Sequence, residues 1–466
     1  MMAREMEIRS LNRCPHRRCV TSLLGGLSGL ALGWSVWQPG GLSFGWLLML
    51  SVFCIPTLSK TSRLAAFFGY YLAAMVLPIT SLRDYDPTLS WTLLAGIGQL
   101  VLALVLAAPY ALFAVGKPSQ AWRSGAGAIL ALLVTALPPL GCVGLASPLF
   151  GATTWFGGLG TTGLILYLLL FGLCVVLLDR VSPPFTTEIH WFGMILALLM
   201  VLAMALGIPA RRSASRGGLY CPVTASCPLR QITTVSFPFG HDVRTWPEFE
   251  KRARLITRLG EQILRRDPGT RLLVYPEEVA GPLDRGFTRL YAGFAERLRE
   301  RHVTAALGAL IPWRVPARTP RQKSHLYWSD GIVFMGQYNR VLIARQPAPV
   351  VEWNPLAQIF RHTHLAMPAF WDLPGGPNPG THPPLDHASY GKTHVIALIC
   401  YEQALVWPIL WSRPRTHPMA ILAPESVHWE KSAAIGDLEA RLARAWGRLY
   451  GLPVALAINL PRASNS

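Results

Sequence analysis

Long apolar stretches that recur through the first 210 residues constrain this chain more than any other feature. Each is near the length of about 20 residues that a helix needs to cross a bilayer. The seven stretches cover residues 20–37, 41–58, 63–80, 91–114, 125–145, 160–179 and 191–209. With 51% hydrophobic and only 15% charged residues overall, the chain is predicted to be a multi-span helical membrane protein.

An uneven distribution of charge divides the chain, because most Arg, Glu and Asp residues lie beyond Arg211. A boundary near that residue separates an apolar half from a polar half. The predicted parts are a basic cytoplasmic N-terminus at 1–19, a transmembrane region at 20–210, a linker at 211–229 and a water-exposed domain at 230–466.

Lys and Arg in the short loops predict the orientation. Basic residues gather in the N-terminus and in alternate loops, which contain Lys60, Lys117 and Arg180, and such residues favour the cytoplasmic side. Seven spans then place everything after residue 210 outside the cytoplasm. Arg211 and Arg212 oppose this orientation, and one span more or fewer would reverse it.

The net charge of +18 suits either nucleic acid or an anionic lipid surface. The sequence contains no recognisable nucleic-acid-binding module, so membrane lipid is the predicted partner and direct nucleic-acid binding is not expected. Transport is also disfavoured, since the spans carry almost no ionisable side chains. Cys14 and Cys19 lack a second pair with metal-ligand spacing, and neither a metal nor a cofactor is predicted.

The hydrophobic pattern changes period beyond residue 229, where short strands alternate with amphipathic helices. Helices are predicted at 247–266, 284–301 and 435–450. Strands are predicted at 230–237, 271–275, 303–311, 331–335, 340–344, 394–399 and 454–459, with the fourth and fifth forming a hairpin. This alternation predicts a layered α/β domain with its active site at strand ends.

Two strand ends carry candidate catalytic residues. Cys400 follows the apolar strand 394–399 directly, which is a position from which a nucleophile can face a cleft. Glu277 follows the strand 271–275 after a proline, and a partly desolvated carboxylate there can accept a proton. Glu278 is an alternative for that role. Taken alone, a cysteine in a buried strand is more often a packing residue.

The order of these motifs resembles the nitrilase (carbon–nitrogen hydrolase) superfamily, in which a Glu, a Lys and a Cys act together. YPEEVA at 275–280 and LICYE at 398–402 carry the resemblance, and the helical first half makes the chain similar to the apolipoprotein N-acyltransferases. The resemblance implies an α/β four-layer sandwich behind a membrane bundle. It also implies a Cys400 thioester formed from an acyl ester, with Glu277 as general base.

The same resemblance implies a set of binding residues. Glu352, Tyr401 and Glu402 would shape the pocket, and Trp246 precedes the first helix of the domain as it does in that family. Trp371 lies in the apolar segment 365–374, which is suited to dip into the membrane interface and admit a lipid. The implied partners are a phospholipid acyl donor and a lipoprotein acceptor.

The family's catalytic Lys has no clear counterpart. An ungapped match places Ala344 there, with Arg345 one residue later and Arg340 nearby, and an Arg guanidinium does not replace an ammonium group without consequence. The runs at 344–353 and 400–410 are most similar to the TraB subgroup of conjugal-transfer proteins, which implies partners in the conjugation apparatus. Three hypotheses remain: a thiol enzyme of acyl transfer or amide chemistry, a non-catalytic component with the same fold, and a true apolipoprotein N-acyltransferase.

Overall fold

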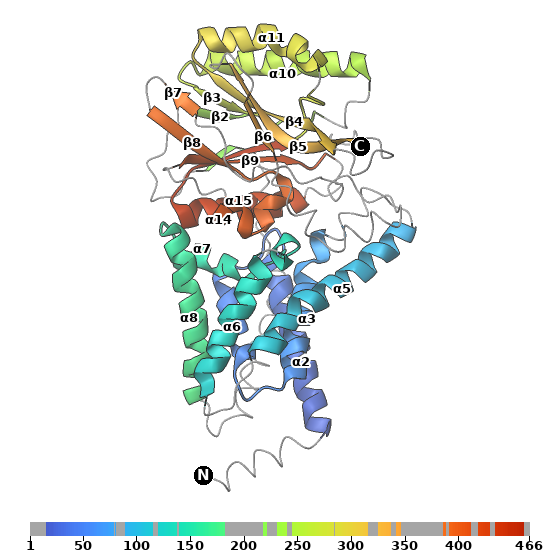
Figure 1. The fold of residues 1–466 in the computed structure, drawn as a ribbon, viewed down its shortest axis with the longest axis vertical. Helices are drawn as coiled ribbons and strands as arrows, with labels where there is room; N and C mark the ends of the chain where they lie inside the picture. The colour runs from blue at the N-terminus through green and yellow to red at the C-terminus, as the bar shows by residue number, and fades with distance from the viewer. Residues whose placement is uncertain are drawn as a thin grey trace. The chain divides into compact units, whose positions relative to one another are not determined.

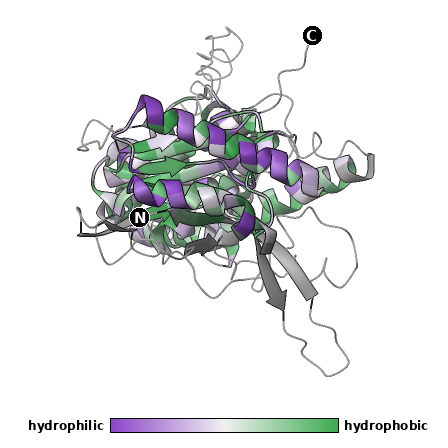
Figure 2. Ribbon diagram, turned by 90° about the horizontal axis from the view of Figure 1, so that it is seen from above, coloured by the Kyte–Doolittle hydropathy of each residue, from purple (hydrophilic) through white to green (hydrophobic). Residues whose placement is uncertain are grey.

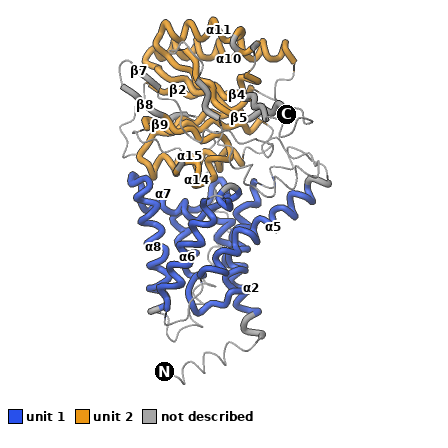
Figure 3. The backbone as a smooth tube through the Cα atoms, viewed as in Figure 1, with its two compact units in different colours: residues 1–212 blue, residues 213–466 orange. Residues whose placement is uncertain are grey.

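A computed structural model divides the chain into two compact units, residues 1–212 and 213–466 (Figure 3). The boundary falls next to Arg211, where the charge density of the sequence changes. The structure describes residues 15–78, 80, 89–114, 120–137, 139–181, 218–220, 231–239, 245–283, 285–315, 325–336, 342–345, 385–387, 391–411, 418–428 and 434–460.

Unit 1 is helical throughout its described residues. Its elements are α2(Pro15–Trp37), η1(Phe44–Cys54), α3(Lys60–Ala74), α5(Leu89–Phe113), α6(Ala121–Ala136), η3(Leu140–Cys142), η4(Pro148–Gly151), α7(Ala152–Trp155) and α8(Gly160–Val181), of which η1, η3 and η4 are 3-10 helices (Figure 1). Helix α2 packs along α3, α3 packs against α5, and α6 packs against both α5 and α8.

Three described helices are long and apolar enough to cross a membrane: Cys19–Trp37, Thr92–Phe113 and Gly160–Asp179. They coincide with three of the seven stretches predicted from the sequence. Helices α3 and α6 have 15 and 16 residues, which is shorter than the sequence pattern suggested. The seventh stretch, 191–209, lies outside the described residues.

The stretch 41–58 differs from its prediction. It contains an eleven-residue 3-10 helix, η1, where a membrane-spanning α-helix was expected. The physical reason is visible at its ends: Pro39 and two glycines precede it, and Pro56 follows it. These residues disfavour helical backbone and leave too few positions for a full span.

Close packing of α2 on α3 depends on glycine. A Cβ atom on Gly29 would overlap the carbonyl oxygen of Ala66, and one on Gly33 would overlap that of Tyr70. Because lipid tails provide no hydrophobic drive for helix association, small residues that allow backbones to approach are a common basis of such contacts. The pair is further joined by a hydrogen bond from Trp37 Nε1 to Tyr70 Oη at 2.9 Å.

Unit 2 contains two five-stranded sheets. The first has the order β1(Gly218–Tyr220), β10(Val454–Asn459), β9(Pro418–Ser426), β8(Gly391–Ala397), β7(Leu385–His387). The second has the order β2(Ile232–Thr234), β3(Leu272–Val274), β4(Thr304–Val315), β5(His325–Gly336), β6(Leu342–Arg345). Strands β8, β9 and β10 are mutually parallel, as are β2, β3 and β4. The antiparallel pairs are β1 with β10, β7 with β8, β4 with β5 and β5 with β6.

A shared apolar core joins the two sheets. Val274 and Ile332 of the second sheet and Leu422 and Ala455 of the first belong to one buried cluster. Helices α10(Trp246–Arg266) and α11(Arg285–Glu300) cover the outer face of the second sheet, while α14(Trp407–Trp411) and α15(Ala434–Tyr450) lie on the side of the first (Figure 1). Viewed from above, α10 and α11 alternate hydrophilic and hydrophobic residues along their length (Figure 2).

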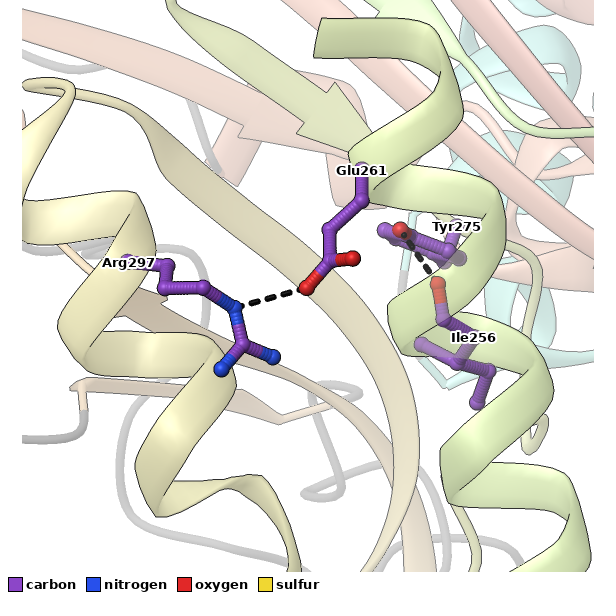
Figure 4. Close-up of polar contacts among 4 residues, drawn as sticks. All are labelled: Ile256, Glu261, Tyr275 and Arg297. Atoms are coloured by element: carbon purple, nitrogen blue, oxygen red, sulfur yellow. Dashed lines mark hydrogen bonds and ion pairs between the residues drawn. The ribbon is translucent and has the colours of Figure 1, made fainter. Parts of the chain in front are cut away.

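The helices over the second sheet are tied to it and to each other by polar contacts (Figure 4). The Tyr275 hydroxyl donates to the Ile256 carbonyl of α10 at 3.1 Å. Arg297 of α11 pairs with Glu261 of α10, with 2.6 Å between Nε and Oε1. Since the Arg297 side chain is 47% exposed, this ion pair contributes no more than about 1 kcal/mol. The contact of Tyr275 fixes the segment that leads to Glu277.

The element predictions for this unit are largely confirmed. All three helices begin and end within one residue of the predicted ranges, and β5 and β6 pair antiparallel as the predicted hairpin. Three strands were missed. β7 and β9 were not predicted, and β1 lies in the range 211–229 that was interpreted as a linker, where it pairs with β10.

Candidate active site

The carboxyl ends of the parallel strands in both sheets meet at one edge of unit 2. The backbone N–H of Phe237, just after β2, donates to the Ile458 carbonyl of β10 at 3.2 Å. The N–H of Leu460 in turn donates to the Phe237 carbonyl at 3.4 Å. Cys400 follows the carboxyl end of β8 and Glu277 follows that of β3, so the topology places both at this edge. Such edges are common sites for ligands in α/β proteins.

Cys400 occupies a turn with unusual backbone geometry. Its φ is +50°, in the left-handed region that few residues other than glycine adopt. It opens the short 3-10 helix η6(Cys400–Ala404) three residues after β8 ends, and its side chain is partly exposed. Backbone of this kind costs about 1–3 kcal/mol and persists only where the surroundings enforce it, which is typical of functional sites.

Three hydrogen bonds hold the turn at Cys400 in place. Glu402 Oε2 accepts from the backbone N–H of Ile399 at 2.8 Å. Gln403 donates through Nε2 to the Leu398 carbonyl at 3.3 Å, and its own carbonyl accepts from Trp446 Nε1 of α15 at 2.9 Å. Glu402 is only 2% exposed. The resemblance assigned Glu402 to the pocket. In the structure its side chain caps the turn at Cys400.

A carboxylate that the sequence analysis missed contacts the thiol. Cys400 Sγ donates to Glu439 Oε1 of α15 across 3.8 Å. Glu439 is 6% exposed and lies among the buried residues of its helix, between Leu438 and Ala440. A charged residue on the buried side of an amphipathic helix is the sequence signal that would have identified it.

A second buried carboxylate lies behind the first. Glu425 of β9 is completely buried, and burial raises the pKa of its carboxyl group well above the ordinary value. The neighbouring Glu439 charge raises this pKa further, while the Gln403 side chain and Arg444 lower it. The net direction is upward, so Glu425 favours its protonated form.

The turn after β3 holds Glu277 away from solvent. Glu277 is 4% exposed, whereas Glu278 is partly exposed and has a φ of +58°. The backbone N–H of Ala280 donates to the Gly308 carbonyl of β4 at 2.9 Å. A Cβ atom on Gly308 would overlap Pro276 and Glu277, so glycine at that position allows the turn to lie directly on β4. Of the two candidate bases, Glu277 is the desolvated one.

The remaining predicted residues fall in different places. Arg345 lies at the end of β6, opposite Gly331 in the ladder, and Ala344 lies opposite Ile332. Trp246 opens α10, is 50% exposed, and packs edge-on against Phe249 with 5.6 Å between ring centroids. Tyr401 is partly exposed in η6. The other predicted residues, Glu352, Trp371 and Arg340, lie outside the described residues.

The arrangement suits thiol chemistry. A partly exposed cysteine at a strained strand exit, with its thiol oriented by a hydrogen bond, has the position that a nucleophile requires. Among the residues that the structure describes, no group of three or more His, Cys, Asp or Glu side chains is placed to hold a metal ion.

Comparison with known proteins confirms the resemblance to the TraB subgroup. Conjugal transfer protein TraB of Agrobacterium fabrum is 29% identical over 203 residues, which are 41% of this chain and 39% of the relative. A probable conjugal transfer protein TraB of Sinorhizobium fredii is 25% identical over 333 residues, which are 71% of this chain and 72% of the relative. The first match therefore spans less than half of that relative's length. No protein-family model matches the chain.

Solved structures with some likeness to the chain carry the names of the superfamily that the motifs resemble. A branch 10 member of the nitrilase superfamily from Saccharomyces cerevisiae has a TM-score of 0.32 and 16% identity, over 52% of this chain and 80% of that one. A carbon–nitrogen hydrolase from Helicobacter pylori has a TM-score of 0.27 and 11% identity, over 47% of this chain and 67% of that one.

Proposed function

We propose that this chain is a membrane-bound, nitrilase-like thiol enzyme that transfers an acyl group, or cleaves a related amide, through a thioester on Cys400. Unit 2 would be a four-layer sandwich of the nitrilase type. The observation that carries the proposal is the left-handed turn that holds Cys400 at the sheet edge with a carboxylate on its thiol. Such strain is costly, and here it falls on a cysteine whose side chain is partly exposed.

The proposed reaction has two half-reactions. In the first, the Cys400 sulfur attacks an acyl ester, Glu277 accepts the thiol proton, and the alcohol leaves with a proton returned by the same carboxyl group. In the second, an amine or water attacks the thioester and regenerates the thiol. A covalent intermediate of this kind divides one difficult transfer into two easier steps. Arg345 is our candidate for stabilising the oxyanion of each tetrahedral intermediate.

The membrane half suggests the substrate class. Three helices of spanning length would anchor the enzyme in the bacterial inner membrane, where a phospholipid acyl donor and a lipoprotein acceptor are both accessible. The curated relatives are named for conjugal transfer, so we place the activity in that process, with unit 2 on the periplasmic side. Apolipoprotein N-acylation is the most specific form of this proposal.

A labelling experiment on the full chain in detergent tests the proposal. The probe is the 4-nitrophenyl ester of an alkyne-tagged long-chain fatty acid, which can form a stable thioester only with a reactive thiol. We expect an acyl adduct on the Cys400 peptide by mass spectrometry and none in the Cys400→Ser variant. Cys19→Ser is the matched control, because Cys19 is a described cysteine that is more exposed than Cys400, and this variant should label as the wild type does. Equal labelling of Cys400→Ser would overturn the proposal.

A second function is favoured by one observation in the sequence. Ala344 stands where the ungapped match places the catalytic Lys of the family, which is what a non-catalytic nitrilase-like component of the conjugation apparatus would show. Conjugation frequency separates the two functions. If Cys400→Ser supports plasmid transfer as well as the wild type while deletion of the chain abolishes it, the structural role is correct and the enzymatic one is not required.

A further inference from the structure

The thiol of Cys400 contacts α15, a helix that lies outside the motifs carrying the family resemblance. Its Sγ lies 3.8 Å from Glu439 Oε1, with the S–H directed as donor. The helix is fixed there by Trp446, which donates to the Gln403 carbonyl of η6 at 2.9 Å. The Trp446 contact therefore holds Glu439 next to the turn at Cys400 without involving the thiol itself.

Two carboxyl groups share the space between α15 and the first sheet. Glu425 is 0% exposed and Glu439 is 6% exposed, and the charge of Glu439 acts on Glu425 strongly enough to raise its pKa. The ionised form of each carboxyl group disfavours the ionised form of the other, because the two charges are alike and little water surrounds them. A single proton held by the pair relieves this repulsion.

The surroundings decide which carboxyl group holds that proton. Glu425 is the more buried, and burial is the largest cause of its raised pKa. Glu439 accepts a hydrogen bond from the thiol, and a hydrogen bond to a carboxylate favours its ionised form. Among the described residues, Asp437 and Arg444 of α15 also act on the pKa of Glu425, and Glu402 lies in the turn next to Cys400. Glu402 already accepts from Ile399.

We propose that Glu439 is a positioning residue that accepts the Cys400 S–H and keeps the thiol protonated and oriented at rest, while Glu425 behind it carries the proton of the pair. The proposal rests on Cys400 being the nucleophile but assigns a residue outside the expected Glu, Lys and Cys set. A negative charge next to sulfur disfavours the thiolate. The resting thiol is thus protected from indiscriminate electrophiles.

Site-resolved alkylation of the full chain in detergent tests this role. The probe is iodoacetamide, and the rate at Cys400 is followed by mass spectrometry from pH 5 to 10. In Glu439→Gln the neighbouring charge is lost, so we expect the midpoint of the Cys400 profile to fall by about one pH unit. Thiolate reactivity decreases as its basicity falls, so the rate at pH 7 should rise only about three- to fourfold.

Two isosteric variants serve as controls. Glu425→Gln replaces a neutral carboxylic acid by a neutral amide, and it should leave the midpoint within about 0.3 units on the same reasoning. Glu296→Gln on the exposed side of α11 should have no effect, and the rate at Cys19 should be unchanged in every variant. If Glu425→Gln shifts the midpoint and Glu439→Gln does not, the proton is on the other carboxyl group and the proposal is wrong.

The outcome does not depend on acyl transfer. Alkylation reports the ionisation of the thiol in a protein with or without activity, and a purely structural role for Glu439 would not move the pH profile. An unchanged profile in a folded Glu439→Gln variant would overturn this inference and leave the thioester proposal standing. If the profile shifts but the fatty-acid ester does not label the wild type, the role of Glu439 stands and the thioester proposal is overturned.

Discussion

At the scale of single residues, the buried carboxyl groups of Glu425 and Glu439 oppose folding when they are ionised. A carboxyl group that is completely buried is stable only as the neutral acid, or with partners that compensate its charge. Here Arg444 and the Gln403 side chain offset only part of the effect of burial on the pKa of Glu425. The site therefore lowers stability at neutral pH, which is common where a fold serves chemistry.

The pH dependence of stability follows from the raised pKa of Glu425. In the unfolded chain the Glu425 carboxyl group loses its proton near pH 4.3, while in the folded protein the group keeps that proton to higher pH. The folded state then binds more protons in that interval, so stability falls as pH rises, by up to about 1.4 kcal/mol per pH unit. We predict that Glu425→Gln removes this slope and unfolds at higher temperature than the wild type at pH 8.

The measurement is the unfolding midpoint of unit 2 in detergent, followed by tryptophan fluorescence at pH 5, 6.5 and 8. At pH 5 the variant and the wild type should differ least, since this pH is less than one unit above the pKa of about 4.3 in the unfolded chain and the loss of stability has only begun to accumulate. A variant that is less stable than the wild type at pH 8 would show that Glu425 is ionised in the fold.

At the scale of elements, amphipathic segments were predicted well and buried ones less so. Helices α10, α11 and α15 alternate polar and apolar faces, and their limits were predicted within one residue. Strand β9 has its last seven residues buried and includes Pro424, so it shows neither the alternation nor the composition on which strand prediction depends.

The candidate site likewise contains residues that the sequence predicts and residues that it does not. Cys400 and Glu277 could be found from the sequence because each follows a recognisable strand. Glu439 could not, because its importance comes from the packing of α15 on η6, which brings together residues 39 positions apart. The capping role of Glu402 also depends on the turn geometry, and a sequence pattern does not specify that geometry.

Packing of α2 against α3 leads to a prediction about unit 1. Replacing Gly29 by Val should force the two helices apart, because even a Cβ would overlap the Ala66 carbonyl. Overpacking of this kind costs about 1–3 kcal/mol. We expect a lower thermal midpoint in detergent, measured by helical circular dichroism. Gly98→Val in α5 is the matched control, since a Cβ there meets nothing within 4 Å. Equal loss in both variants would contradict the close-packing explanation.

At the scale of the whole molecule, the proposed orientation of unit 2 depends on charge and the number of spans. Basic residues in the N-terminus and in alternate loops favour a cytoplasmic N-terminus. The sequence predicts seven spans, of which three are described helices of spanning length, and an odd total would carry the chain to the opposite side. A phospholipid acyl donor and a lipoprotein acceptor would both meet Cys400 on that side, so the proposed chemistry depends on the same assignment.

Reporter fusions after residue 466 test the orientation, and we predict an active alkaline phosphatase and a dark green fluorescent protein at that position. Alkaline phosphatase folds only where its disulfides form, which restricts its activity to the periplasmic side. The same reporters fused after Lys117, in a loop predicted to be cytoplasmic, should give the reverse result and thereby control for expression. A fluorescent fusion after residue 466 would place Cys400 in the cytoplasm, and the acceptor would then have to be a cytoplasmic amine rather than an exported lipoprotein.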